Sequence, residues 1–237
     1  MKKTALCLIL ALLLTGCAAP KVHVLSSDEQ IAVLAERFSG LESEVEWLSY
    51  ESSTQFAVTD LDGNGLLELV VSSMQGTGLF SYSHYYEVNE DGSGVTEWQW
   101  PQPMESEPDI GYADMAFYSD EDGVRHYRLE DYIRNGYAEN WLGLYDVVYR
   151  DDMIEQTLLA ERYAVIRDGS DEFDMTFYDG NGQEITEAEF DAVANTMQTG
   201  QTAHIGWMGY DQVKGLGKED LVRPLADSWA EFSAESV

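Results

Sequence analysis

Apolar residues near the start of the chain recur at helical spacing. Positions i, i+3, i+4 and i+7 are filled by Ile31, Leu34, Ala35 and Phe38. Ser26 and Glu29 have the spacing of a capping box, and Gly40 stands where a helix commonly ends. The pattern therefore predicts a first helix over about 26–40, with its apolar stripe packed against a core.

Two further helices are predicted near the end of the chain. Thr186 and Glu189 again have capping-box spacing, and an apolar stripe follows them and ends near Gly200. A last helix is expected from Pro224 to about Phe232, because proline is favoured at the first helical position.

Between these helical segments, from 55 to 178, the period changes to that of strands. Runs rich in Val, Tyr, Phe and Trp are separated by Asp-Gly turns, which predicts about eight or nine antiparallel strands. The clearest alternation, over 80–88, puts aromatic residues on one face and Ser81, Ser83 and Glu87 on a face expected to meet solvent. Similar runs occupy 116–118, 124–131, 141–149, 158–166 and 173–177. Strands grouped together with helices at the ends predict an α+β domain, an antiparallel β meander covered by two or three helices.

The first sixteen residues have the pattern of an export signal. Lys2 and Lys3 precede an unbroken apolar run from Ala5 to Leu14, which is too short to be well suited to crossing a bilayer about 30 Å thick. The following Leu14-Thr15-Gly16-Cys17 resembles the lipobox of bacterial lipoproteins. That resemblance implies removal of residues 1–16, a diacylglyceryl group on Cys17 and anchoring at the extracytoplasmic face of the cell membrane. The alternative is an ordinary secretory signal with a chance cysteine near the cut.

The remaining chain is expected to be a tether over 17–26 and a single extracytoplasmic domain over 27–237. The whole chain has a formal net charge of -31, and removal of Lys2 and Lys3 with the signal would make the charge of the exported part more negative by two. Such a chain repels phosphate backbones, which excludes nucleic acid as a partner. Cys7 and Cys17 are the two cysteines, so the exported domain has no thiol pair for a disulfide and relies on its core.

One loop carries candidate metal chemistry. Asp60-Leu61-Asp62-Gly63-Asn64-Gly65-Leu66-Leu67-Glu68 places oxygen-bearing side chains at loop positions 1, 3, 5 and 9, with Gly65 at the sharp turn. Position 12 is Val71 where an EF-hand has glutamate, and the flanks look like strands. We therefore expect a hairpin loop. The alternative is that Asn64-Gly65 is merely a type I′ turn.

The segment from Asp60 to Glu68 resembles the calcium loops of FG-GAP and integrin-like repeats. It also resembles a similar segment in exported lipoproteins of gut-type Firmicutes. The resemblance implies Ca²⁺ as cofactor, with these ligands: Asp60, Asp62, Asn64, the Leu66 carbonyl and Glu68. The related Asp179-Gly180-Asn181-Gly182 has Phe177 and Ile185 where the first copy has Asp60 and Glu68, so we expect a bare turn there.

The remaining candidates are weaker. Trp98 and Trp100 are two residues apart on a predicted strand and therefore lie on the same face. If exposed, the two rings could stack on a sugar, although such a pair more often packs in the core. The four histidines lack ligand spacing, and no nucleophile elbow, zinc-protease motif or phosphate loop is present, so no catalytic residue is named. We expect a membrane-anchored binding or interaction module with an unidentified extracytoplasmic ligand or protein partner. A glycan-binding surface protein and a hydrolase with a non-local acidic cleft are the alternatives.

Overall fold

The computed structural model describes residues 24–44, 54–75, 80–100, 107–167 and 172–234. The proposed signal 1–16, Cys17 and most of the tether lie outside these residues. The helices are α1 (Ser27–Glu44), α2 (Glu187–Ala194) and α3 (Lys218–Glu231), with short 3₁₀ turns η3 (Asn195–Gln198) and η4 (Tyr210–Gln212). Within the described part, no helix is long and apolar enough to span a membrane.

The strands form two antiparallel sheets, so the α+β class is confirmed and the single meander is wrong. The five-stranded sheet has the order β12-β1-β2-β3-β4. Its strands are β12 (Met208–Gly209), β1 (Thr54–Thr59), β2 (Glu68–Gln75), β3 (Phe80–Val88) and β4 (Val95–Glu97). The meander fails because β12 returns from late in the chain to pair with β1.

The eight-stranded sheet has the order β10-β9-β8-β7-β6-β5-β11-β13. Its strands are β10 (Glu184–Ile185), β9 (Phe173–Asp179), β8 (Met153–Ile166), β7 (Glu139–Arg150), β6 (Arg125–Asn135), β5 (Asp114–Ser119), β11 (Gln201–His204) and β13 (Ser233–Ala234). The five central strands β5–β9 do follow one another as consecutive antiparallel neighbours. This part of the expected meander is confirmed.

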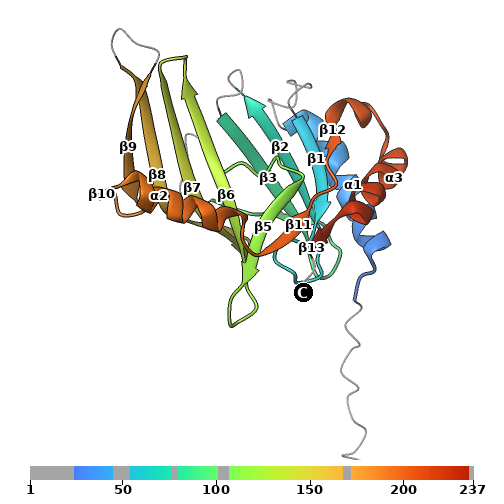
Figure 1. The fold of residues 1–237 in the computed structure, drawn as a ribbon. Coiled ribbons are helices and arrows are strands. Elements are labelled where there is room, and N and C mark those ends of the chain that lie inside the picture. Colours follow the sequence, from blue (N-terminus) through green and yellow to red (C-terminus); the bar gives the residue numbers. More distant parts are fainter. Residues whose placement is uncertain (1–23, 45–53, 76–79, 101–106, 168–171, 235–237) are drawn as a thin grey trace, which may run out of the picture.

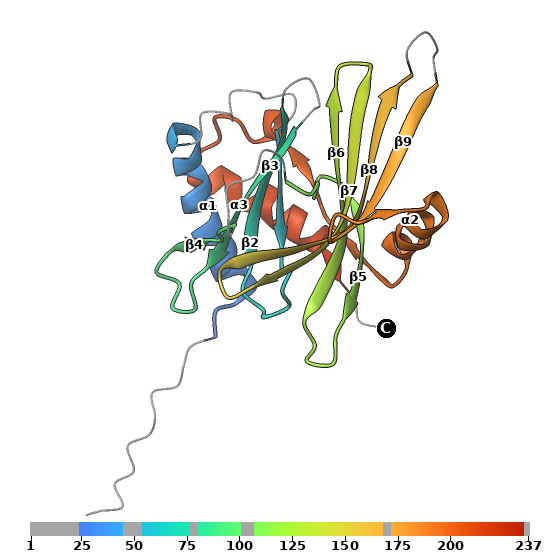
Figure 2. The ribbon, with the colours of Figure 1, turned by 90° about the vertical axis from the view of Figure 1, so that its left-hand side faces the viewer.

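The elements stack as helix, sheet, sheet and helix (Figures 1 and 2). Helices α1 and α3 pack on one face of the five-stranded sheet through the first core cluster, which includes Leu34, Phe38, Phe56 and Leu225. The second cluster lies between the two sheets, and a third joins the outer face of the eight-stranded sheet to α2. Burial of three apolar layers is the main source of stability in a described region without cysteines.

Strand β3 is covered on both faces, so the expectation of a solvent-facing side is wrong. Tyr86 and Val88 belong to the core beneath α1, while Tyr85, on the opposite face, is 1% exposed in the core between the sheets. Ser83 is also buried. The alternation along β3 predicts a solvent-facing side only if a single layer packs on the sheet. The eight-stranded sheet provides a second layer and buries that side.

Both expected capping boxes are confirmed. The Ser26 backbone N–H donates to Glu29 Oε2 at 2.8 Å, and Thr186 and Glu189 make the same reciprocal pair. Helix α3 begins six residues before Pro224, contrary to the expected start at this proline. Leu221 and Leu225 are both buried, so packing keeps the helix continuous past a residue that lacks an N–H donor.

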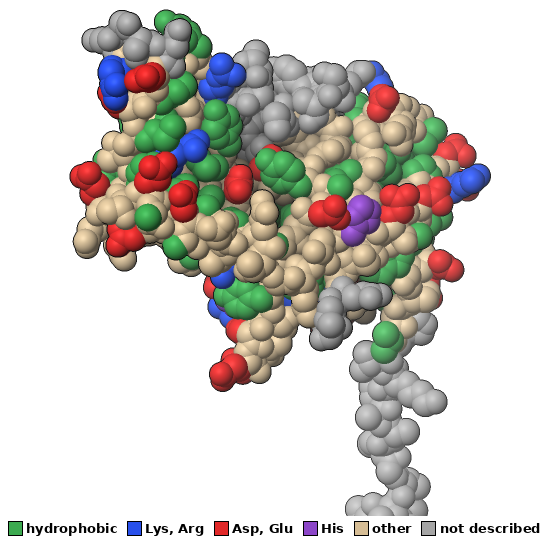
Figure 3. Space-filling model, viewed as in Figure 1, with side chains coloured by type: hydrophobic (Ala, Val, Ile, Leu, Met, Phe, Trp, Pro, Cys, Tyr) green, Lys and Arg blue, Asp and Glu red, His purple; other side chains and the backbone are tan. Residues whose placement is uncertain are grey.

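Acidic side chains are dispersed over the surface. In Figure 3, Asp and Glu side chains are scattered among apolar and neutral ones across the face shown, with a few Lys and Arg between them. The charge of the chain is therefore spread over many solvated positions on this face.

Candidate metal-binding loop

The Asp-rich segment is a hairpin loop between β1 and β2, as the sequence predicts. These strands are antiparallel, and Thr59 pairs with Glu68 at the base of the loop. Gly63 and Gly65 have φ angles of 77° and 87°, whereas Asn64 is not among the described residues with positive φ. A type I′ turn needs positive φ at both central residues, so Asn64-Gly65 does not form one. The loop is wider than a plain two-residue turn.

Three carboxylates converge inside this loop. One carboxylate oxygen from each of Asp60, Asp62 and Glu68 lies within 4.8 Å of the other two. Asp60 and Asp62 are partly exposed and Glu68 is fully buried. Oxygens of three acids at this separation can surround a single cation, which would offset their mutual repulsion.

Only one of the two carboxylate oxygens of Glu68 accepts hydrogen bonds from described residues. Its Oε2 accepts hydrogen bonds from Thr59 Oγ1 at 2.7 Å and from the Leu61 backbone N–H at 2.9 Å. Its Oε1 is buried and has no hydrogen-bond partner among the described residues. A buried carboxylate oxygen without a partner is unfavourable, and a cation between Glu68 and the two aspartates would satisfy it.

The protein surroundings of the loop disfavour negative charge on its acids. Burial raises the pKa of Glu68 well above its ordinary value, and the charges of Asp62 and Asp60 raise it further. Burial, together with the charge of Asp60, raises the pKa of Asp62 to about 6. Burial also raises the pKa of Asp60, against backbone hydrogen bonds and the nearby Arg125. A bound cation would reverse these shifts because it favours the ionised carboxylates.

The other two expected ligands, Asn64 and Leu66, are joined to each other by a hydrogen bond. Asn64 Oδ1 accepts the Leu66 backbone N–H at 2.6 Å, and Asn64 Nδ2 donates to Asp62 Oδ2 at 2.9 Å. The amide oxygen is thus turned toward the backbone, and it would have to rotate to bind a metal shared with Asp62. Leu66 is held in the loop by this hydrogen bond, and its carbonyl stays a predicted ligand.

A fourth acid, which the sequence analysis missed, lies beside the loop. Glu87 of β3 pairs across the sheet with Glu68 of β2, and its Oε2 accepts a hydrogen bond from Asn64 Nδ2 at 3.2 Å. Burial raises the pKa of Glu87 to about 7, with the charges of Asp62, Asp152 and Asp60 adding to the effect. Only the register between β2 and β3 reveals this neighbour, because the two glutamates are far apart in the sequence.

Two residues far from the loop in the sequence, Arg125 and Gln30, form hydrogen bonds to its backbone, and the sequence around them does not indicate this role. Arg125 Nη1 of β6 donates to the Asp60 carbonyl at 2.5 Å, and a Cβ on Gly63 would lie 2.8 Å from the Arg125 guanidinium carbon. Gln30 of α1 donates to the Gly65 carbonyl at 3.0 Å and accepts the Leu67 N–H at 2.7 Å. The loop is therefore fixed to α1 and also, through Arg125, to the eight-stranded sheet.

The loop opens onto a cavity of about 570 Å³. Asp62 and Asn64 line it from the loop, Glu87 lines it from β3, and Asp151 and Asp152 line it from the β7–β8 turn. These last two residues have φ angles of 51° and 59°, which aspartate tolerates better than most residues. A cation or water molecule can reach the exposed side of the loop through this cavity.

The second Asp-Gly-Asn-Gly segment is a bare turn, as expected. Asp179 Oδ1 accepts the backbone N–H groups of Asn181 at 2.9 Å and Gln183 at 2.8 Å. These hydrogen bonds lower the pKa of the exposed Asp179 carboxylate. Its oxygen is thus satisfied by the backbone, in contrast to that of Glu68.

The Trp98/Trp100 pair does not form an exposed platform. Trp98 is 3% exposed, and its ring stacks against Tyr85 and Tyr149 between the two sheets. Trp100 is partly buried against the same cluster. The two rings share a face, as predicted, and that face is in the core.

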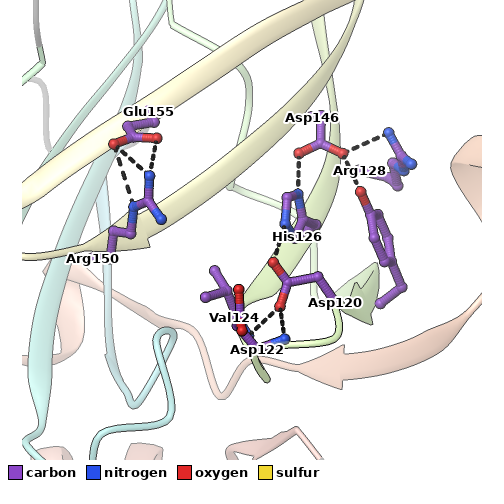
Figure 4. Close-up of polar contacts among 9 residues, drawn as sticks. Asp120, Asp122, Val124, His126, Arg128, Asp146, Arg150 and Glu155 are labelled. Atoms are coloured by element: carbon purple, nitrogen blue, oxygen red, sulfur yellow. Dashed lines mark hydrogen bonds and ion pairs between the residues drawn. The ribbon is translucent and has the colours of Figure 1, made fainter.

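The described histidines are paired with acids. His126 Nδ1 lies 2.7 Å from Asp146 Oδ1, and its Nε2 lies 3.5 Å from Asp120 Oδ2. Figure 4 shows this network on β6 and β7, where Arg128 also binds Asp146. His84 and His204 each contact a carboxylate, and His23 lies outside the described residues. The three described histidines therefore have polar partners, as expected of satisfied histidines.

Comparisons with family models, with curated proteins and with solved structures find no match for this chain.

Proposed function

We propose that this chain is a lipid-anchored extracytoplasmic lipoprotein whose β1–β2 loop binds calcium, and that its exported domain is a binding module. The lipobox-like Leu14-Thr15-Gly16-Cys17 supports the anchor. The observation that carries the metal site is Glu68, whose buried Oε1 is without a hydrogen-bond partner among the described residues while its carboxylate lies close to those of Asp60 and Asp62.

Calcium fits this loop better than other common cations. All three converging side chains offer oxygen, which hard cations prefer, and calcium accepts irregular oxygen coordination whereas magnesium requires a nearly ideal octahedron. Zinc sites usually contain histidine or cysteine, and neither is in the triad. Because Val71 replaces the bidentate glutamate of an EF-hand, we expect a dissociation constant of about 10⁻⁴ to 10⁻³ M, as in extracellular modules.

The bound ion would mainly stabilise the β1–β2 loop, at the place where this loop contacts both α1 and the eight-stranded sheet. Asp60 directly follows β1 and Glu68 begins β2, while Gln30 and Arg125 connect the same loop to α1 and β6. A cation that draws the three carboxylates together would stiffen this loop by stabilising the conformation that these hydrogen bonds already hold. Because the loop contacts both sheets, a more rigid loop would also stabilise their packing against each other.

The test is a melting curve of the full chain in chelator and in millimolar calcium. At calcium about ten times the dissociation constant, mass action gives about 1.4 kcal/mol of stabilisation, or a rise of about 3 to 6 °C in Tm. Asp60→Ala and Asp62→Ala should erase this rise. Asp179→Ala is the matched control and should retain it, because its carboxylate serves only a bare turn. An equal rise in all three variants, or none in the unmodified protein, would overturn the metal site.

A further inference from the structure

The inner face of the eight-stranded sheet carries a group of rings and acids that the metal loop does not involve. On β7 and β8, this inner aromatic face consists of Trp141, Tyr145, Glu161 and Tyr163. The register pairs Trp141 with Tyr163, and pairs Gly143 with Glu161 one row further along. Alternation along β7 places Trp141, Gly143 and Tyr145 on the side of the core between the sheets, opposite α2.

The rings on this face are held in position by specific contacts. The indole N–H of Trp141 donates to Glu161 Oε2 at 2.8 Å. Trp141 and Tyr145 meet edge to face, with ring centroids 6.4 Å apart. A Cβ on Gly143 would lie 2.6 Å from both rings, so glycine is needed for them to close over the strand. The arrangement is preorganised and does not depend on a ligand to form it.

Part of this face is open to solvent. Tyr163 is 40% exposed and Trp141 is partly exposed, whereas Tyr145 is buried. Strands β8 and β9 lie toward the side of the sheet away from the five-stranded sheet (Figures 1 and 2), whereas β3 packs against β6 and against Tyr149 of β7. Among the described residues, the Tyr145 end of the face is therefore the end nearer the five-stranded sheet, and the Tyr163 end is the more exposed one.

Acids surround the rings. Asp131 pairs with Gly143 from β6, and burial together with the charges of Asp131 and Glu161 raises the pKa of Tyr145. Glu139 lies beside Tyr163, whose pKa is raised by desolvation and by this acid. Flat apolar rings next to carboxylate acceptors suit a ligand that has apolar C–H faces and hydroxyl donors at its edge. The same acids repel an anionic ligand.

From this arrangement we infer that the inner aromatic face binds a neutral sugar, with a pyranose ring lying against Tyr163 and Trp141 and its hydroxyl groups donating to Glu161. The inference gives a ligand class to the binding module proposed above, on which it rests, and it is independent of the calcium loop. It also differs in location from the buried Trp98/Trp100 pair.

The experiment titrates the full chain with neutral hexasaccharides of glucose, mannose and N-acetylglucosamine, and with an anionic galacturonate hexamer, by calorimetry. The detergent must carry no sugar headgroup. At least one neutral probe should bind at millimolar or lower concentration, and the anionic probe should bind more weakly. Titrations in chelator and in calcium should agree, so a failure of the metal site would not be mistaken for a failure of the sugar site.

Variants locate the binding. Tyr163→Ala and Trp141→Ala should each weaken binding by about tenfold or more. Tyr132→Ala is the matched control, since Tyr132 is 47% exposed and pairs with Leu142, which belongs to the opposite, α2-facing side. Should Trp141→Ala fail to fold, Tyr163→Ala decides, because Tyr163 is the more exposed of the two residues. Absence of binding by every neutral probe, tighter binding of the galacturonate, or equal losses in Tyr163→Ala and Tyr132→Ala would overturn the inference.

Discussion

The hydroxyl group of Tyr127 donates a 2.6 Å hydrogen bond to the backbone carbonyl of Leu61. Tyr127 lies in β6 of the eight-stranded sheet and is fully buried, while Leu61 lies in the loop that joins two strands of the other sheet. The contact therefore connects the two sheets directly at the candidate metal site. It makes the conformation of the loop dependent on packing between layers.

Tyr127→Phe should weaken that connection. The change removes one buried hydrogen bond and leaves the Leu61 carbonyl with only the longer 3.3 Å contact from Arg125, at a cost of about 1 kcal/mol in the free energy of unfolding. Calcium affinity should fall a few-fold because the loop is less well held. Denaturant unfolding with and without calcium measures both effects. Tyr137→Phe, at a residue 76% exposed, should change neither.

Glu68→Gln should separate metal binding from folding. The amide oxygen can still accept from Thr59 and Leu61, and the neutral side chain carries no charge to desolvate. We therefore expect unfolding free energy in chelator to stay the same or rise by up to about 2 kcal/mol, while the calcium-dependent rise in Tm disappears.

A matched change at Glu87 serves as the control. Glu87 lies beside the loop and outside the triad of converging oxygens, so Glu87→Gln should keep most of the calcium response. Melting curves of both variants in chelator and calcium make the comparison. A full calcium response in Glu68→Gln would remove the main support for the site.

Glu107 should make stability depend on pH. Burial, with the charge of Asp131 adding to it, raises the pKa of Glu107 from 4.5 to about 8, against a backbone hydrogen bond from Ser83. Between these values the folded protein holds a proton that the unfolded chain has released. This contribution to stability is thus complete below about pH 4.5 and is lost as pH rises through 8.

The expected loss is on the order of a few kcal/mol over that range. Glu107→Gln keeps an acceptor for the Ser83 N–H, 2.7 Å away, and cannot titrate, so it should flatten the decline. Urea unfolding in chelator from pH 5 to 9 measures the slope. An identical slope in the variant would show that Glu107 ionises normally in the folded protein.

Cys17→Ser should release the protein from the membrane and abolish labelling by a fatty-acid analogue, since the thiol would be the site of acylation. Cys7→Ser provides the control within the same segment, because Cys7 lies in the apolar run that the resemblance assigns to the removed signal. Labelling and fractionation of cells measure both properties. Retained labelling in Cys17→Ser would exclude the proposed anchor.

Local patterns were sufficient for the features that neighbouring residues create. Capping boxes at Ser26 and Thr186 depend on side chains three residues apart, and both form. The convergence of Asp60, Asp62 and Glu68 follows from their spacing in one hairpin. The central strands were likewise predicted by their composition and period, although their ends extend further in the structure.

Tertiary packing decided what such patterns leave open. The second sheet buries Trp98 and the Tyr85 face of β3, and strand register brings Glu87 to the loop. Helix α3 passes through Pro224 because Leu221 and Leu225 are buried together. Sequence by itself determined which residues can cap, turn or ligate, since those are short-range interactions. Burial and strand register depend on which layers pack against each other. That packing reflects the free energy of many contacts between segments far apart in the sequence, so only the folded structure determines burial and register.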